Sequence, residues 1–577
     1  MKKLSDLHEV FLSFKAEKAE GTSIVFINKG LKFNLTEEEI LSKYSYVVGC
    51  RGIGGGKTRH EKEFYAERYG GDGILRNGGG GRCGFDGDYQ LKGIGPNNLV
   101  GANSDEAHGN GLLSLETAVY ESIWAEIINI ALPYGAMRSV AIISMGTEFN
   151  QDGKTYARGL LVREPAVRPA HFIRAPYFND ISPDSLCSDA RRVKFAVQRL
   201  IEFLPARPDS ELVSNLGFGL VELAKRYARQ FAAARAKRII HYNVSASNVS
   251  LNGAWLDLSG TRMFSQLITG DKLDIDRFVG EYIPALDSIR CLCYGLCKYS
   301  VVSAEDADMV WMDVLLQFEA EYELRFGYYL ALQAGFCSRL LDDCIGSPCF
   351  LDFSRALKNI LLLDEFSMSL VAEGMVKGGY EFWGKDLYLS LLLGKVSKLV
   401  NGAFGIWIDS LRLERLSLAY SSLFDLILER ALLNNIGRVG MVRGMAINLV
   451  RLNRSDNLLL DLKDHISSAL NDVKKTSSSA ELGRVVEDVV QVASINYGNE
   501  SSFVVPFWES EPVTIGYDME RDCFIVKPKG MESSVVRGLS EVVSVSGEIE
   551  KAKNYYEPVW DYFMKETFDL YTDYESQ

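Results

Sequence analysis

The sequence lacks long apolar runs and has no surplus of positive charge. Its apolar stretch at 387–393 is stopped by Lys395, well short of the roughly 20 residues that a membrane-spanning helix needs. No apolar run follows the first lysines, so the N-terminus does not resemble a signal peptide. A net charge of −13 argues against a sequence-independent nucleic-acid binder, because such proteins neutralise phosphates with clustered lysine and arginine. We therefore expect a soluble, cytoplasmic protein with no membrane span and no nucleic-acid partner.

Cysteine is also sparse, at 10 of 577 residues, and this excludes a disulfide-rich scaffold. What is present is an ordinary globular composition of 47% hydrophobic and 24% charged residues, which excludes disorder over most of the chain. The length exceeds what one hydrophobic core normally supports, so we expect more than one domain or lobe.

The apolar pattern changes from mainly β to mainly helical along the chain. Apolar residues at helical spacing predict one long amphipathic helix between Leu115 and Pro133. Helical periodicity dominates from about residue 190, apart from a β-rich insert at 239–258. Short apolar or alternating segments predict strands in the first part of the chain, at 23–27, 88–92, 140–145 and 159–162.

A small β lobe with one long helix, followed by a larger helical lobe, is the layout of a protein-kinase-like fold. We therefore predict an α+β, bilobal architecture with a β-rich N-lobe at 1–190, a helical C-lobe at 191–400 and a helical C-terminal extension at 401–577. The extension contains a predicted hairpin at 502–526 and an acidic aromatic tail at 555–574.

Two groups in the N-lobe can bind a phosphate. The glycine run at 77–82 ends in Arg82 and lacks side chains that would keep a phosphate away from backbone N–H groups, although such a run can also be a simple turn. Lys92 lies in a predicted strand, and Glu116 opens the long helix 24 residues later. A strand lysine paired with a helix glutamate holds ATP phosphates in kinases; the alternative is a surface lysine and an ordinary first-turn glutamate.

Two further groups follow. Arg163 and Arg168 lie after a predicted strand, where arginine can fork onto phosphate oxygens or pair with surface carboxylates. Asn248 precedes Asp257 by nine residues, across a short apolar strand. These two side chains can place oxygen ligands on one Mg²⁺, an ion that shares its shell with phosphates, or they can simply end a hairpin.

The order and spacing of these motifs resemble the selenoprotein O family, whose members have a protein-kinase-like fold and transfer AMP, rather than phosphate, to protein hydroxyls. The resemblance covers roughly residues 65–290. In the N-lobe, 69–71 is similar to the start of the family's Y-G-G-H-Q-F-G, 79–82 to its G-D-G-R with glycine in place of the acid, and 91–96 to its L-K-G-A-G-P. Asp105 stands where the family has the aspartate of D-G-R.

Later segments continue the resemblance. Glu116 and Glu121 keep the spacing of the family's R-E-F-L-C-S-E helix. Arg163 and Arg168 resemble its T-R … R-x-G-x-F element, which is two residues shorter here. The segment 241–257 aligns without a gap to H-G-V-x-N-T-D-N-M-S-I-x-G-x-T-I-D.

The resemblance implies that the chain binds ATP with Mg²⁺ or Mn²⁺ and acts on a protein or peptide substrate. It implies that Glu116 orients Lys92 and that Asn248 and Asp257 hold the metal. The residues implied at the nucleotide are Arg82, Lys92, Arg163 and Arg168 on the phosphates, with Gly79, Gly81 and Asp105 lining the site.

One position departs from the family pattern. The proton acceptor, the aspartate of T-D-N, is Ser247 here, and a serine is too weak a base at neutral pH. Because positioning and charge neutralisation supply most of the catalysis of transfer to phosphorus, the remaining groups predict a slow adenylyltransferase. Alternatively, the acceptor is a carboxylate that is already ionised, so that the chain activates a peptide carboxylate, as microcin-type peptide maturation requires.

Two other hypotheses stay open. A phosphotransferase can use the same groups. A nucleotide-binding pseudoenzyme can instead serve as a scaffold, with a protein partner bound through the unmatched C-terminal half of the chain.

Overall fold

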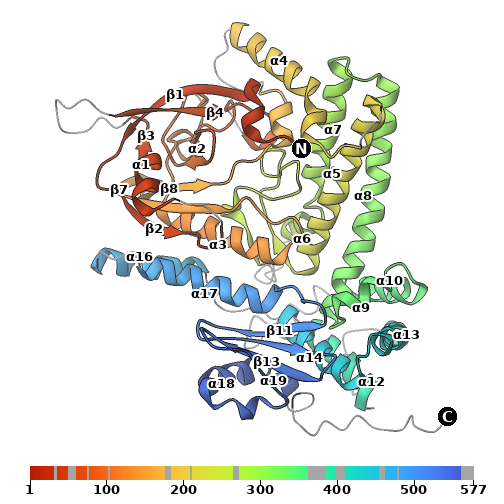
Figure 1. The fold of residues 1–577 in the computed structure, drawn as a ribbon. Coiled ribbons are helices and arrows are strands. Elements are labelled where there is room, and N and C mark those ends of the chain that lie inside the picture. The colour runs from red at the N-terminus through yellow and green to blue at the C-terminus, as the bar shows by residue number, and fades with distance from the viewer. Residues whose placement is uncertain are drawn as a thin grey trace.

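The computed structural model describes residues 1–31, 35–49, 60–74, 77–101, 104–175, 183–207, 211–263, 272–361, 384–397, 410–453, 462–476, 480–560 and 564. Within these ranges an antiparallel sheet near the N-terminus is followed by a mainly helical region, and a second sheet lies near the C-terminus (Figure 1). The predicted α+β class is therefore confirmed. No helix in these ranges is both long enough and apolar enough to cross a membrane.

The N-terminal sheet joins strands that are far apart in the sequence. Its eight described strands, in spatial order, are β2 (Ser23–Ile27), β7 (Ser139–Gln151), β8 (Lys154–Arg163), β6 (Gln90–Lys92), β5 (Cys83–Phe85), β4 (Glu61–Glu67), β1 (Phe11–Lys18) and β3 (Tyr46–Val47). Strand β6 lies inside the sheet, where Lys92 pairs with Cys83 on one side and Leu161 on the other. The predicted strands all overlap strands of this sheet.

Helix α3 (Leu115–Ala131) is the long helix predicted from the sequence. It begins at Ser114, whose hydroxyl accepts the backbone N–H of Thr117, and it ends before Pro133. One side packs against β7 and β8, and α16 (Leu462–Thr476) and α17 (Ala480–Tyr497) pack on another side (Figure 1). Nearly all of its side chains are consequently buried, so the predicted exposed face is wrong: C-terminal helices cover it. Two shorter helices accompany the sheet, α1 (Glu37–Tyr44) and α2 (Glu106–Gly109).

The central helical region is built around the closely packed pair α5 (Leu212–Ala236) and α8 (Ala304–Gln333). The other helices of this region are α4 (Pro183–Gln198), α6 (Lys272–Val279), α7 (Ile283–Lys298), α9 (Ser338–Asp342) and α10 (Pro348–Leu361).

The predicted β-rich insert at 239–258 is mostly loop. Strand β9 (Ile239–Ile240) pairs only with β10 (Arg262–Met263) among the described strands. The Trp255 N–H donates to the Gly135 carbonyl at 3.1 Å, and its carbonyl accepts the Met137 N–H at 2.9 Å. These bonds attach the loop to the chain that enters β7, and so to the N-terminal sheet.

The C-terminal part combines helices with a small sheet. The predicted hairpin at 502–526 is part of an antiparallel sheet of four described strands, β11 (Val504–Glu509), β12 (Val513–Asp518), β13 (Cys523–Pro528) and β14 (Ser534–Val536). The predicted acidic tail lies largely outside the described residues. The remaining helices are α12 (Gly384–Ser397), α13 (Ser410–Leu433), α14 (Arg438–Asn453), α18 (Ser546–Tyr555) and α19 (Glu557–Val559).

Candidate functional site

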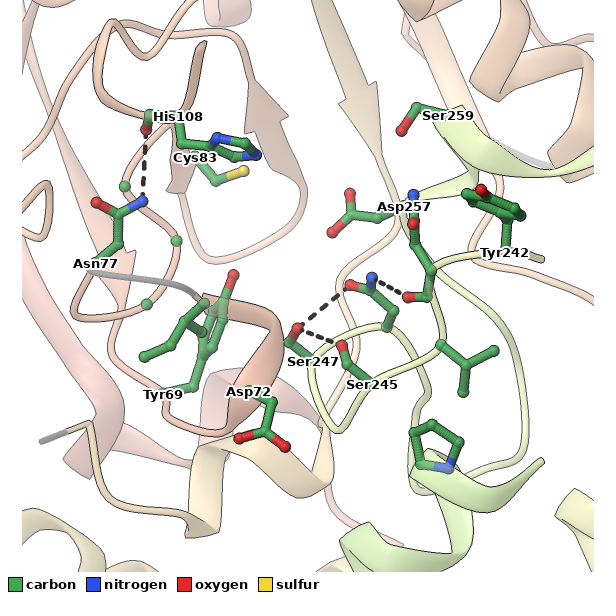
Figure 2. Close-up of a pocket in the computed structure, with 18 of the residues that line it drawn as sticks. Tyr69, Asp72, Asn77, Cys83, His108, Tyr242, Ser245, Ser247, Asp257 and Ser259 are labelled. Carbon is green, nitrogen blue, oxygen red and sulfur yellow. Dashed lines mark hydrogen bonds between the residues drawn. The ribbon is translucent and has the colours of Figure 1, made fainter. Parts of the chain in front are cut away.

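One pocket of about 670 Å³ collects most of the predicted site residues (Figure 2). Its lining includes the glycine run at 79–82 and Lys92 from the sheet region, and the loop at 242–248 and Asp257 from the helical region. Residues between 277 and 284, at the junction of α6 and α7, also line it. The volume is ordinary for a small-molecule site. The structure therefore brings the two predicted groups, cations and oxygen donors, into one cleft.

The Asp257 carboxylate contacts cations from three separate parts of the chain. Its Oδ1 accepts hydrogen bonds from Lys92 Nζ at 2.6 Å and Arg163 Nη1 at 2.7 Å, and its Oδ2 lies 3.9 Å from Arg168 Nη1. Burial alone would raise the pKa of Asp257, but the charges of Arg163 and Lys92 hold that pKa well below its usual range. The backbone of Asp257 is left-handed, with φ at +56°, which is uncommon outside glycine. An ionised carboxylate is thus fixed in the pocket.

Lys92 is held between two carboxylates, with its side chain 1% exposed. Its Nζ lies 2.8 Å from both oxygens of Glu121, besides the contact with Asp257. The prediction that Glu116 orients Lys92 is therefore wrong. The two glutamates are five residues apart, about 140° around an α-helix, so they face different neighbours. Glu116 instead accepts a long hydrogen bond of 3.4 Å from the Ser467 hydroxyl of α16.

Arg163 and Arg168 are buried and bind protein groups. Arg163 Nε donates to the Gln90 side-chain oxygen at 2.5 Å, in addition to its bond with Asp257. Arg168 Nη1 donates to the Ser247 carbonyl at 2.9 Å. Neither arginine is among the residues that line the pocket. The structure therefore places them behind Asp257 and the loop, rather than in the phosphate-facing positions that the resemblance implied.

A second buried network orients these arginines. The Gln90 amide nitrogen donates to Glu67, whose Oε2 lies 3.1 Å from His171 Nε2. Burial would raise the pKa of Glu67, but the hydrogen bond from His171 and the charge of Arg168 lower it overall. Burial lowers the pKa of His171. The sequence gives no spacing signal for this network, because its members come from β4, β6 and the loop after β8.

The glycine run contributes space and Arg82 rather than free backbone donors. Gly79 has φ at +140°, and a Cβ there would lie 2.3 Å from the Glu67 carbonyl oxygen, so only glycine fits. The N–H groups of Gly80 and Gly81 already donate to the carbonyls of Glu67 and Gly79. Arg82 lines the pocket, and its guanidinium makes no hydrogen bond or ion pair with the described residues.

Asp105 reaches the pocket only through a neighbour. Its carboxylate caps α2, accepts the His108 N–H at 2.9 Å and lies 2.6 Å from His108 Nδ1. His108 lines the pocket, whereas Asp105 does not and is 60% exposed. The expected role of Asp105 at the nucleotide is therefore corrected: it orients His108.

The candidate metal ligands Asn248 and Asp257 both line the pocket. Asn248 Nδ2 donates to the Asn243 carbonyl at 2.7 Å, and its Oδ1 accepts a long bond of 3.3 Å from the Ser247 hydroxyl. The Ser247 hydroxyl also lies 2.9 Å from that of Ser245 (Figure 2). Amide and carboxylate oxygens are donors that a hard divalent cation prefers. Nowhere in the described ranges do three or more His, Cys, Asp or Glu side chains gather as a metal site.

Sequence reasoning missed the wall formed by Tyr242, Arg277 and Glu281. The Tyr242 ring lies between the guanidiniums of Arg262 and Arg277, each 4.4 Å from its centre. The Glu281 carboxylate accepts the backbone N–H groups of His241 at 3.2 Å and Tyr242 at 2.6 Å. Burial raises the pKa of Glu281 to about 8. The available signal was Tyr242 itself, which stands where the family pattern has glycine.

A scan against protein-family models and a search of curated proteins found no match to this chain.

Proposed function

We propose that the pocket binds ATP with Mg²⁺ or Mn²⁺ and transfers AMP to a protein or peptide, on a bilobal protein-kinase-like scaffold. The observation that carries this proposal is the ionic chain from Glu121 through Lys92 to Asp257, which borders a pocket that Arg82 also lines. A strand lysine held by a helix glutamate, next to a metal-binding aspartate, positions nucleotide phosphates in kinases. The resemblance to selenoprotein O supports AMP as the transferred group.

The distribution of charge suits a polyanion. The guanidinium of Arg82 makes no hydrogen bond or ion pair with the described residues, and Lys92 is already aligned by Glu121. The phosphate oxygens of ATP would form ion pairs with Arg82 and with Lys92, which would keep its contact with Asp257. The side-chain-free backbone at 79–81 leaves room for the nucleotide beside these cations.

The oxygen donors fit a hard cation. Oδ1 of Asp257 accepts the hydrogen bonds of Lys92 and Arg163, whereas Oδ2 accepts none from the described residues. We assign Asp257 Oδ2 and Asn248 Oδ1 as the protein ligands, with phosphate oxygens and water in the rest of the shell. The cation would neutralise phosphate charge during transfer. The part played by the protein is to hold these oxygens and Lys92 in fixed positions.

The residue at position 247 limits transfer to hydroxyl groups. Ser247 bonds to Ser245 and Asn248 and cannot remove a proton at neutral pH. A missing general base typically lowers the rate by about 10²–10⁴-fold, which leaves a slow enzyme. A phosphotransferase and a catalytically inactive scaffold are the alternatives that the same pocket allows.

Separate reactions with ATP labelled at the α- or the γ-phosphate distinguish these functions. With Mg²⁺ and a mixture of soluble proteins as acceptors, we expect covalent incorporation of the α-label and none of the γ-label. Asp257→Asn should lower incorporation at least about 100-fold by removing a metal ligand and the partner of Lys92. The matched control is Asp308→Asn, on the exposed surface of α8, which should change nothing.

Incorporation of the γ-label would instead identify a phosphotransferase. Nucleotide binding in calorimetry without any label transfer would identify a scaffold. A chain that binds no nucleotide at all would contradict the proposal.

A further inference from the structure

One wall of the pocket carries a stack of three side chains, none of which is among the residues proposed to bind the nucleotide or the metal. The Tyr242 ring is sandwiched between Arg262 of β10 and Arg277 of α6, and each guanidinium carbon lies 4.4 Å from the ring centre. Such cation–π stacking fixes the plane of a guanidinium. Tyr242 and Arg277 line the same pocket as Lys92 and Asp257. Figure 2 shows Tyr242 and Cys83 on different sides of Asp257.

The backbone is strained where it presents this ring. Tyr242 has φ at +75°, a left-handed conformation that is unfavourable for a bulky residue. Glu281 holds this conformation, because its carboxylate accepts the N–H groups of both His241 and Tyr242. A left-handed backbone at an aromatic residue and a buried carboxyl group each destabilise the fold, and here both hold the Tyr242 ring in place. Strain of this kind concentrates at binding and catalytic sites.

The stack leaves hydrogen-bond donors facing the pocket. The Arg277 side chain is exposed and makes no hydrogen bond or ion pair within the described part of the chain, and the Tyr242 hydroxyl makes no hydrogen bond there either. Glu281, the acidic residue nearest to Arg277 in sequence among those that line the pocket, already accepts hydrogen bonds from the backbone N–H groups of His241 and Tyr242. A guanidinium presents a planar fork of donors, which matches the two oxygens of a carboxylate.

We propose that Arg277, stacked on Tyr242, binds a carboxylate of the acceptor, and that AMP is transferred to this carboxylate. This inference rests on the proposed nucleotidyl transfer and names its acceptor. A carboxylate oxygen attacks the α-phosphorus of ATP and forms a new P–O bond. The bond from that phosphorus to the bridging oxygen breaks, and pyrophosphate leaves with the electron pair. The product is an acyl adenylate, and no proton is removed from the acceptor.

This chemistry explains why a serine suffices at position 247. A carboxylate is ionised at neutral pH, so its attack needs no base at Ser247. A hydroxyl acceptor would need one, and it would leave the forked donors of Arg277 unmatched.

Exchange between ATP and labelled pyrophosphate tests the proposal, because acyl adenylate formation is readily reversed. The probes are a mixture of random hexapeptides made without Asp or Glu, with free C-termini, and the same mixture with amidated C-termini. We expect exchange that depends on the free C-termini, and an adduct that hydroxylamine cleaves. Arg277→Gln should raise the KM for the free peptides about 10- to 100-fold, the loss expected for one charged hydrogen-bonding partner, with Mg-ATP affinity changed less than about twofold. Arg290→Gln, an exposed arginine of α7 outside the pocket lining, is the matched control and should match the unmodified chain.

Several results would overturn the proposal. Equal exchange with amidated peptides, or a hydroxylamine-stable adduct, would make the acceptor a hydroxyl. An unchanged peptide KM in Arg277→Gln would show that Arg277 does not bind the acceptor carboxylate. A loss of Mg-ATP affinity as large as the rise in the peptide KM would show instead that Arg277 binds a phosphate. No exchange with any peptide in a chain that binds Mg-ATP would refute the carboxylate acceptor and leave AMP transfer standing. Absence of Mg-ATP binding would refute the proposed function itself.

Discussion

Substituting Glu121 by glutamine tests how the pocket holds its lysine. Lys92 Nζ lies 2.8 Å from both oxygens of Glu121, and the two side chains are 1% and 4% exposed. Removing one partner of a buried ion pair typically costs about 3–5 kcal/mol, because the other charge stays buried. Asp257, 2.6 Å from the same nitrogen, still compensates part of that charge. We therefore expect Glu121→Gln to lower the free energy of unfolding by about 3 kcal/mol, at the lower end of this range.

Glu116→Gln is the matched control on the same helix. Within the described part of the chain, the Glu116 carboxylate has the 3.4 Å contact from Ser467 as its one hydrogen bond, so its substitution should cost less than about 1 kcal/mol. Urea unfolding followed by tryptophan fluorescence measures both variants, since Trp124 is buried on the same helix. Calorimetry should show weaker Mg-ATP binding for Glu121→Gln, because Lys92 loses the partner that aligns it. Equal losses, or a larger loss for Glu116→Gln, would refute the assignment of Glu121 as the partner of Lys92.

Three further predictions concern the walls of the pocket. Gly79→Ala should lower the free energy of unfolding by more than about 2 kcal/mol in urea titrations, because its Cβ would lie 2.3 Å from the Glu67 carbonyl oxygen at a left-handed φ. Gly80→Ala is the control: its Cβ would lie 3.6 Å from the nearest atoms, so it should lower the free energy of unfolding by less than about 1 kcal/mol. Ser247→Asp should raise hydroxylamine-stable AMP transfer to hydroxyl acceptors about 10²-fold or more, and a variant with no gain would show that no base is missing there. The contribution of Glu281 to stability should fall as pH rises from about 5 to 8, because the folded chain keeps the proton of Glu281, whose pKa is about 8, while the unfolded chain has released it. The lowered pKa of His171 acts in the opposite direction, so the measurement is the difference in urea midpoints between the unmodified chain and Glu281→Gln across that range, and this difference should shrink as pH rises.

The sequence predicted which distant residues lie in one pocket better than it predicted which of them form ion pairs. The order of the motifs indicated that Lys92 and Asp257 share a pocket, and they are in direct contact. The partner of Lys92 was predicted wrongly, because Glu116, Glu121 and Glu126 all lie on α3 and only the rotation of this helix decides which of them faces β6. That rotation follows from the cap at Ser114 and from packing between the sheet and the C-terminal helices. Neither was visible in the local spacing.

Contacts between residues that are far apart in the sequence were even harder to predict. Arg277 follows Tyr242 by 35 residues with no shared periodicity, so their stack depends on how α6 lies against the loop. The glycine run predicted a loop that cradles a phosphate or a simple turn, whereas the close neighbour of Gly79 in the structure is the Glu67 carbonyl of β4. That carbonyl also binds the Gly80 N–H, which the phosphate interpretation had left free.

The C-terminal helices bear directly on the proposed site, although none of their residues was predicted to contribute to it. Helices α16 and α17 pack along α3, the helix that carries Glu121. Lys463 of α16 lies 5.2 Å from the centre of the Tyr120 ring, one residue before Glu121, and Ser467 reaches Glu116. Because α3 is buried between these helices and the sheet, a shift of α16 or α17 would move Glu121 relative to Lys92. A protein partner bound to the C-terminal part of the chain, which is one of the hypotheses left open above, would therefore act on Lys92 through the packing of α16 and α17 against α3.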